Sequence, residues 1–181
     1  MSIDARPVIE LLDTTRHDRS GFSCGVEALD RYLQSQASQD ARRRVAAPYV
    51  LIEPPSPNIL GFYTLSNTSI QAAELPGALV KKLPRYPVLP ATLLGRLAVD
   101  AKGRGRGLGT ELLVNALRRC LRSETASLAV VVDAKDDAAA SFYERHEFVK
   151  LAEQPNRLFM PMAEIEKLFG ETEGLGTGLS P

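Results

Sequence analysis

The sequence contains no tryptophan, two cysteines and two histidines among its 181 residues. Two cysteines make no disulfide framework, and the positions of Cys24 and Cys120 suit no metal site, so we expect neither disulfides nor a bound metal. Free thiols are typical of the reducing cytosol, which predicts a cytoplasmic protein.

Long hydrophobic runs are also absent. The longest apolar stretches, such as Leu128 to Val132, have the length of a strand and are too short to span a membrane. The first ten residues contain acids and no apolar core, so we expect no signal peptide.

An excess of charge of either sign is missing as well, because 22 Lys and Arg balance 22 Asp and Glu. This balance argues against a general nucleic-acid coat protein. From residue 163 onward one lysine, Lys167, stands against four glutamates, which leaves 21 basic and 18 acidic residues before that point. Local basic patches therefore matter more than the total charge.

The length and an ordinary globular composition predict one domain, at residues 1–169. Residues 170–181 are rich in Gly and Glu, and we expect them to be disordered. Strands followed by helices, with hairpins at both ends, predict an α/β protein with a mixed sheet.

Hydrophobic periodicity and turn residues predict the individual elements. We expect strands at residues 8–12, 49–53, 59–66, 93–99, 127–133, 148–151 and 157–162. We expect helices after residues 24–27 running to about Ala46 before Pro48, at 108–121, 136–146 and 163–169, with a helical turn near 78–83 inside a Pro-rich loop at 76–90.

A glycine-rich loop at residues 101–107 lies between a predicted strand and a predicted helix. Glycines allow positive φ and a close backbone approach, and the first N–H groups of a helix lack internal partners. Such a helix start binds pyrophosphate, and Arg104 and Arg106 add donors suited to phosphate. A P-loop motif is absent, and Leu108 and Thr110 stand where a dinucleotide fingerprint needs glycine. A solvated Gly/Arg turn is the alternative interpretation.

The segment Arg104-Gly105-Arg106-Gly107-Leu108-Gly109 resembles the [QR]-x-x-G-x-[GA] loop of the GNAT superfamily of acetyltransferases. The resemblance implies that the loop's backbone amides hold the pyrophosphate of acetyl-CoA, and that the preceding strand pairs with the pantetheine arm. The cofactor-binding residues expected from the family's motifs are Leu97, Ala98, Val99, Arg104, Gly105, Arg106, Gly107, Leu108, Gly109, Thr110, Asp136 and Phe142.

Residues 131–148 resemble a second family motif, N-x-x-A-x-x-[LF]-Y-x-x-x-G-F. This sequence departs from that motif at Asp136, where Asn is usual, and at Glu147, where Gly is usual. The resemblance implies a single-domain GNAT fold, in which a mixed, mostly antiparallel central sheet is flanked by helices.

Tyr143 is the predicted catalytic residue, as the acid that protonates the departing thiolate of CoA. A thiol with a pKa near ~8.5 and a phenol near ~10 make this transfer plausible without a strong driving force. Backbone N–H groups of residues 97–99 would polarise the acetyl carbonyl. The alternative for Tyr143 is an aromatic ring packed beside the cofactor.

No strong general base stands out. His17 and His146 are expected at the surface or at a helix end, while Asp100 and Glu27 could act through water. A base is needed less when the acceptor is an α-amine, whose pKa of ~7.7–8.0 lies below the ~10.4 of lysine. This favours an α-amine acceptor.

The N-terminal half resembles the GNAT toxins of bacterial toxin–antitoxin operons. The similarity includes Phe22-Ser23-Cys24-Gly25, Leu29 to Leu33, Gly61 to Ser66 and Gly95 to Asp100, and extends over residues 8–162. It implies acetylation of the amino acid on charged tRNA, a block of translation, a ribbon-helix-helix antitoxin as partner, and a homodimer.

Three basic clusters could contact tRNA phosphates, and each could instead be a solvated face. The predicted tRNA-binding residues are Arg42, Arg43, Arg44, Lys81, Lys82, Arg85 and Arg96. Two other functions remain open at this point. One is a GNAT enzyme that acetylates a small amine or a protein N-terminus, and the other is a non-catalytic partner of a DNA-binding antitoxin.

Overall fold

The computed structural model describes residues 6–173, with the backbone alone for residues 171–173. Its strands are β1 (Val8–Leu11), β2 (Ala47–Ile52), β3 (Ile59–Gln71), β4 (Val88–Val99), β5 (Ala129–Asp133), β6 (Val149–Leu151) and β7 (Gln154–Pro161). Its helices are α1 (Glu27–Arg31), α2 (Ala37–Arg42), α3 (Gly77–Val80), α4 (Leu108–Leu121), α5 (Asp137–Arg145) and α6 (Met162–Glu173). A π-helical turn, η1 (Tyr32–Gln36), and two 3-10 turns, η2 (Ala72–Glu74) and η3 (Ala101–Gly103), complete the set.

The seven strands form one sheet in the order β1-β2-β3-β4-β5-β7-β6, which confirms the predicted mixed sheet flanked by helices. The chain also divides into two compact units. The first holds the chain up to Ser66 together with Leu94–Ala116, and the second holds Asn67–Leu93 together with the chain from Leu117 onward. Strands β3 and β4 and helix α4 contribute residues to both units.

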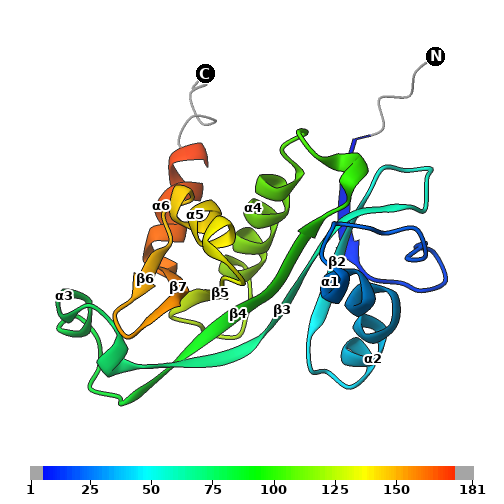
Figure 1. Ribbon diagram of the computed structural model, residues 1–181. Helices are drawn as coiled ribbons and strands as arrows, with labels where there is room; N and C mark the ends of the chain where they lie inside the picture. Colours follow the sequence, from blue (N-terminus) through cyan, green and yellow to red (C-terminus); the bar gives the residue numbers. More distant parts are fainter. Residues whose placement is uncertain (1–5, 174–181) are drawn as a thin grey trace, which may run out of the picture. The chain divides into compact units, whose positions relative to one another are not determined.

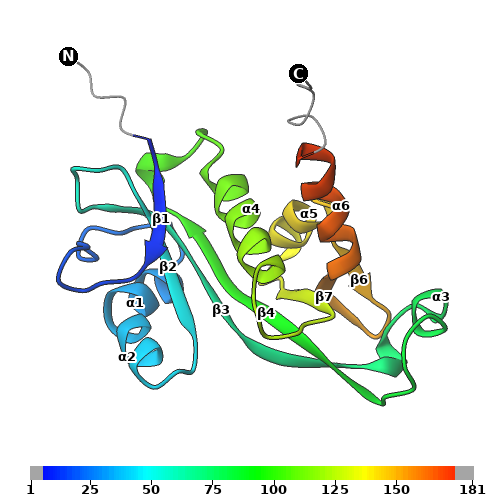
Figure 2. The same cartoon turned by 180° about the vertical axis from the view of Figure 1, so that it is seen from behind.

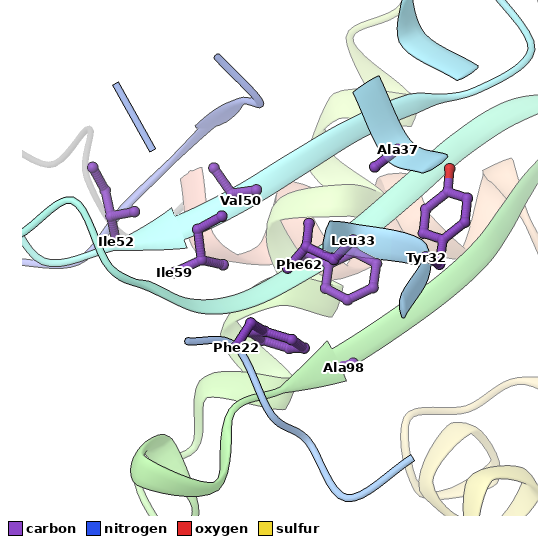
Figure 3. Close-up of a cluster of buried hydrophobic side chains, with 9 residues drawn as sticks. All are labelled: Phe22, Tyr32, Leu33, Ala37, Val50, Ile52, Ile59, Phe62 and Ala98. Atoms are coloured by element: carbon purple, nitrogen blue, oxygen red, sulfur yellow. The ribbon is translucent and has the colours of Figure 1, made fainter. Parts of the chain in front are cut away.

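In the first unit, β1 and β3 pair antiparallel with the two edges of β2. The segment α1-η1-α2 follows the N-terminal loop, and α2 packs against β2 (Figure 1). Because successive strand residues face opposite sides, β2 and β3 direct alternate apolar side chains toward these helices. The resulting core cluster, drawn in Figure 3, consists of Phe22, Tyr32, Leu33, Ala37, Val50, Ile52, Ile59, Phe62 and Ala98.

In the second unit, β7 pairs antiparallel with β5 on one side and β6 on the other. Helices α5 and α6 both pack against β7 (Figure 2). The buried cluster of this unit consists of Ile70, Leu75, Leu89, Ala91, Ala129, Val131, Leu151 and Phe159. Among residues 6–173, no helix is both long enough and apolar enough to cross a membrane.

The first helical segment ends earlier than predicted, at Arg42 instead of about Ala46. Arg44 takes a positive φ of 57°, and the N–H of Val45 returns to the carbonyl of Asp40, so the chain turns there. Pro48, predicted to end the helix, lies within β2 opposite Thr64. Pairing with β3 therefore places Pro48 inside a strand, whereas the sequence pattern used this proline as the end of the helix.

Strands β3 and β4 are longer than their apolar patterns predicted. Strand β3 continues to Gln71, and β4 begins at Val88 although it contains Pro90. The N–H of Ala72 bonds to the carbonyl of Pro87, and the carbonyl of Pro90 accepts from Leu128. Backbone pairing thus extends both strands. The added residues include polar residues and a proline, which the sequence pattern predicts to lie in loops.

The helices next to the predicted site agree closely with expectation. Helix α4 has the predicted bounds, and α5 spans Asp137–Arg145 with Asp136 and His146 as its caps. Helix α6 continues to Glu173, beyond Phe169 where its end was predicted. The rest of the tail predicted to be disordered, residues 174–181, lies outside the described residues.

The turn after α5 contains the second departure from the family motif. Glu147 takes a φ of 71°, in the left-handed region that favours glycine. The N–H groups of His146 and Phe148 both donate to the carbonyl of Tyr143, which ends the helix. The turn therefore forms with glutamate in place of glycine, at a cost in backbone strain.

Replacing Glu147 with glycine is expected to raise the free energy of unfolding by about 1 kcal/mol, because a left-handed conformation costs an L-residue roughly that amount. Urea denaturation followed by circular dichroism measures the change. Glu147→Ala is the matched control, since it removes the charge and keeps Cβ. Equal stabilisation by alanine and glycine would show that charge, and not φ, is responsible.

Candidate active site

Strand β4 leads directly into the glycine loop, which lies in the first unit. Ala98 faces the core and is buried, whereas Leu97 and Val99, which alternate with it, are half-buried. Alternation along a strand directs these two side chains to the opposite face of the sheet. The backbone of residues 97–99, which the family motif assigns to the pantetheine arm, thus ends directly before Asp100.

Asp100 is buried and fixes the start of the loop. One carboxylate oxygen accepts from the N–H of Ser23 at 2.8 Å, and the other accepts from the N–H of Lys102 at 2.8 Å. The N–H of Ala101 returns a bond to the carbonyl of Ser23 at 2.8 Å. The suggestion that Asp100 is a general base therefore gains no support, because the residue is 4% exposed and its carboxylate holds two backbone segments together.

Two glycines shape the loop before α4. Gly105 and Gly107 have φ values of 76° and 73°, and no other atom lies within 4 Å of where a Cβ would be. Conformation, and not crowding, is therefore the reason for glycine at these positions. The N–H of Glu111 bonds to the carbonyl of Gly107, so the amides of Leu108 and Gly109 precede the regular helical bonds. Such an exposed helix start is suited to an anion.

Both loop arginines are held by the protein. Nη2 of Arg104 donates to the carbonyl of Cys24 at 2.8 Å. Arg106 forms an ion pair with Glu53, which follows β2. The cationic groups predicted to receive phosphate thus already have oxygen partners within the first unit.

Asp136 precedes helix α5 of the second unit, and its side chain accepts from the N–H of Ala139 at 2.8 Å. A hydrogen bond from Lys135 and this backbone bond hold the pKa of Asp136 below its usual value. Asp136 replaces the family's asparagine and acts as the helix N-cap, as asparagine also does. Its predicted contact with the cofactor stays a prediction.

Tyr143 lies in the middle of an aromatic cluster on α5. Its ring packs edge-on against Phe142 and Phe148, with centroids 5.2 and 5.4 Å away. The side chain is buried, and burial raises the pKa of Tyr143 well above the usual phenol value. The hydroxyl therefore keeps its proton at neutral pH, which is the state required of a proton donor.

The two histidines have different environments. His146 caps α5, where Nδ1 lies 2.8 Å from the carbonyl of Phe142, so its prediction as a helix-end residue is confirmed. The prediction of a surface position for His17 is wrong, because its side chain is buried. Its Nδ1 accepts from the N–H of Asp13 and its Nε2 lies 2.9 Å from a carboxylate oxygen of Glu10. These bonds stabilise a polar ring in the interior.

The predicted tRNA-binding residues lie on three segments. Arg42, Arg43 and Arg44 end α2 in the first unit, and Lys81, Lys82 and Arg85 follow α3 in the second. All six side chains are exposed, and within residues 6–173 none pairs with a carboxylate. Arg96 differs, because it lies half-buried on β4 with its guanidinium over the ring of Tyr32. Glu27, the other candidate base, is exposed and paired with Arg31.

Residues 58–150 match the family model described as "Acetyltransferase (GNAT) domain". The matched segment contains β3, β4, the glycine loop and Tyr143. The chain belongs to the GNAT acetyltransferase family. It is therefore an acetyltransferase by family, and the predicted GNAT fold is confirmed.

Two curated family members are similar along nearly the whole chain. One is "Probable toxin TacT" of Sinorhizobium fredii, 30% identical over 92% of this chain and 97% of the relative. The other is the "tRNA-acetylating toxin" of Mycobacterium tuberculosis, 35% identical over 85% of this chain and 92% of the relative.

Solved structures of family members agree. AtaT complexed with acetyl-methionyl-tRNAfMet has a TM-score of 0.84 and 32% identity, covering 91% of this chain and 99% of that one. A tyrosine-to-phenylalanine mutant of AtaT bound to acetyl-CoA and to the C-terminus of the antitoxin AtaR has a TM-score of 0.77 and 28% identity, covering 90% and 98%.

Two features of the site had no sequence signal. Asp100 is an acidic residue at the end of a strand, which is a common arrangement. Nothing in the neighbouring sequence predicts that it accepts a hydrogen bond from the N–H of Ser23, 77 residues away. Tyr32 lies in the first predicted helix, and hydrophobic periodicity gives no indication that its ring contacts Arg96, which lies 64 positions later in the sequence.

Replacing Asp100 with asparagine is expected to lower the free energy of unfolding by about 2 kcal/mol, because an amide cannot accept both backbone N–H bonds and loses the charge that strengthens them. Urea denaturation measures the loss. Asp18→Asn, in an exposed turn that asparagine also forms, is the matched control and should change little. Unchanged stability of Asp100→Asn would show that the two bonds are dispensable.

Proposed function

We propose that this acetyltransferase transfers the acetyl group of acetyl-CoA to the α-amine of the amino acid on a charged tRNA, and that it thereby acts as a toxin that blocks translation. The main support is similarity along most of the chain to a protein named a tRNA-acetylating toxin, at 35% identity. The solved relative with acetyl-methionyl-tRNA supports the same class of substrate.

The cofactor-binding residues of this proposal are those expected from the family motifs. The backbone of Leu97, Ala98 and Val99 pairs with the pantetheine arm, and the amides of residues 104–110 hold the pyrophosphate. Asp136 and Phe142 contribute contacts from the start and middle of α5. The positive φ of Gly105 and Gly107 supports this role for the loop, because it orients successive backbone N–H groups at the start of α4.

In the proposed reaction, the nitrogen of a neutral α-amine attacks the acetyl carbonyl, a C–N bond forms and the C–S bond breaks. Tyr143 donates its proton to the departing thiolate, the ammonium formed loses a proton to solvent, and the tyrosinate regains a proton from solvent. Burial disfavours the tyrosinate as well as the free thiolate, so the proton moves between two groups whose charged forms burial affects in the same direction.

Seven cations supply the proposed contacts with tRNA, and all of them except the half-buried Arg96 are exposed. The residues are Arg42, Arg43, Arg44, Lys81, Lys82, Arg85 and Arg96. Unpaired cations release counterions when they bind phosphate, and they need no base-specific geometry to do so. No acidic residue lies between Glu74 and Asp100, a stretch that includes four of these seven cations.

The proposal includes partners and organisation. A ribbon-helix-helix antitoxin would neutralise the enzyme, in line with the solved complex of AtaT with the C-terminus of AtaR. We further propose a homodimer in the cytoplasm and a single acetyltransferase domain that includes α6.

The proposal is tested by incubating the protein with radiolabelled acetyl-CoA and a pool of charged tRNA, with uncharged tRNA and free amino acids as controls. Label on charged tRNA alone is the expected result, and it should disappear when the aminoacyl ester is hydrolysed. Label on free amino acids or on neither tRNA pool, with CoA binding intact, would reject charged tRNA as the substrate.

Tyr143→Phe is expected to lower kcat for acetyl transfer by about 10²-fold or more, because general acid catalysis contributes that much. The KM for acetyl-CoA should stay within about twofold, since the ring and its packing are kept. Tyr86→Phe, which removes an exposed hydroxyl, is the matched control. A Tyr143→Phe enzyme as fast as wild type would reject the acid role and leave Tyr143 as a packed aromatic residue.

Glu53→Gln is expected to lower the Kd for CoA about two- to fivefold, because Glu53 competes with phosphate for Arg106 and an ion pair near the surface contributes only modestly. Isothermal titration calorimetry measures the affinity. Glu164→Gln changes the net charge equally at a position paired with Lys167 on α6, and should leave Kd unchanged. Equal gains in both variants would indicate a general charge effect.

A further inference from the structure

Among the contacts within residues 6–173, Arg96 is the one predicted tRNA-binding residue whose side chain is held by a specific contact. Its guanidinium carbon lies 3.6 Å from the centre of the Tyr32 ring. No carboxylate within the described part of the chain, residues 6–173, forms an ion pair with it. Stacking fixes the plane of a guanidinium and leaves the N–H donors along its edge available. Arg96 is therefore oriented and still able to bind an anion.

Tyr32 is itself rigidly held. Its ring is 4% exposed and stacks on Phe62, at 6.2 Å between centroids and 19° between planes. Figure 3 shows its hydroxyl directed toward the helical segment that carries Ala37. That hydroxyl donates to a carboxylate oxygen of Asp40 at 2.9 Å. Burial raises the pKa of Tyr32 to about 12, so the hydroxyl remains a neutral donor.

The π-helical turn η1 makes the bond between Tyr32 and Asp40 possible. The N–H of Ala37 bonds to the carbonyl of Tyr32, five residues back, which adds one residue to a helical turn. In an unbroken α-helix two positions eight residues apart differ by about 80° around the axis, and with one added residue they differ by about 20°. The wide turn thus brings Asp40 onto the side of the helical segment that carries Tyr32.

Arg96 projects from one face of β4, whereas Leu97 and Val99, in the segment proposed to bind the pantetheine arm, project from the other face. Arg96 and Ala98 are two residues apart on β4 and so share one face of the sheet. Ala98 belongs to the same buried cluster as Tyr32 and Phe62, on the side of α1 and α2. Leu97 and Val99 face the opposite side. The polyanion best placed for Arg96 is therefore one on the side of the arginines that end α2.

We propose that Tyr32, fixed by Asp40, is a positioning residue that holds the Arg96 guanidinium against a backbone phosphate at the acceptor end of charged tRNA. This inference rests on the proposed function. A planar guanidinium binds a phosphate through two parallel N–H bonds, and its orientation decides whether both can form. Because Tyr32 already fixes that orientation, Arg96 loses less conformational entropy on binding than an unrestrained arginine would lose.

The test compares Tyr32→Leu, Tyr32→Phe, Arg96→Ala and the double variant Tyr32→Leu/Arg96→Ala, with separate KM values for charged tRNA and acetyl-CoA. Tyr32→Leu should raise the KM for charged tRNA about tenfold. The KM for acetyl-CoA should not change. Tyr32→Phe keeps the stacked ring and should restore most of the affinity. The double variant should be no worse than Arg96→Ala alone, because Tyr32 acts through Arg96.

Arg43→Ala is the control for independence, since its effect on KM should multiply with that of Tyr32→Leu. Arg96→Met, which can pack on Tyr32 but donates no hydrogen bond, tests the same contact if Tyr32→Leu does not fold, and it should raise the KM for charged tRNA like Arg96→Ala.

Several outcomes would overturn the inference: effects of Tyr32→Leu and Arg96→Ala that multiply, a matching rise in the KM for acetyl-CoA, or an unchanged KM for charged tRNA in Arg96→Met. The wild-type enzyme is assayed first. No transfer to charged tRNA by wild type would reject the proposed function and this inference together, whereas normal transfer with unaffected variants would reject the inference alone.

Discussion

The buried carboxylate of Asp100 joins two distant parts of the chain, and the cofactor loop depends on that connection. Through its bonds to the N–H groups of Ser23 and Lys102, it holds the end of β4 and the start of η3 against the N-terminal loop. Arg104 adds a contact to the carbonyl of Cys24, next to Ser23. A buried charge is stable only when fully hydrogen-bonded, so the segments have little freedom to separate.

Apart from Arg96, the cations predicted to bind cofactor or tRNA fall into two groups that differ in their partners. Arg104 and Arg106 are held by a carbonyl and a carboxylate near the glycine loop. The basic residues after α2 and α3 have no carboxylate partner within the described range of residues 6–173. Paired cations keep a defined geometry, while unpaired exposed cations favour a large polyanion. This division fits a compact phosphate ligand at the loop and an extended RNA elsewhere.

Much of the fold near the site could be predicted from local sequence. The bounds of α4 and the approximate span of α5 follow from apolar periodicity, which acts within a few residues. Strands β3 and β4 were predicted too short, because their outer halves contain polar residues and Pro90 and are set by pairing between distant segments. The end of α2 was predicted too late for the same reason, because Pro48 belongs to β2 and pairs with β3.

The candidate site likewise contains some features that local sequence predicts and others that depend on contacts between distant residues. Glycines at 105 and 107 and a tyrosine at 143 are recognisable in sequence, because positive φ and a motif position depend on residue type. Burial of His17, the bonds of Asp100 and the stacking of Arg96 on Tyr32 each join residues far apart in the chain. Local chemistry thus determined the family, the loop and the predicted acid. The partners of the buried and stacked charges depend on which distant segments meet, and packing of the folded chain alone decides that.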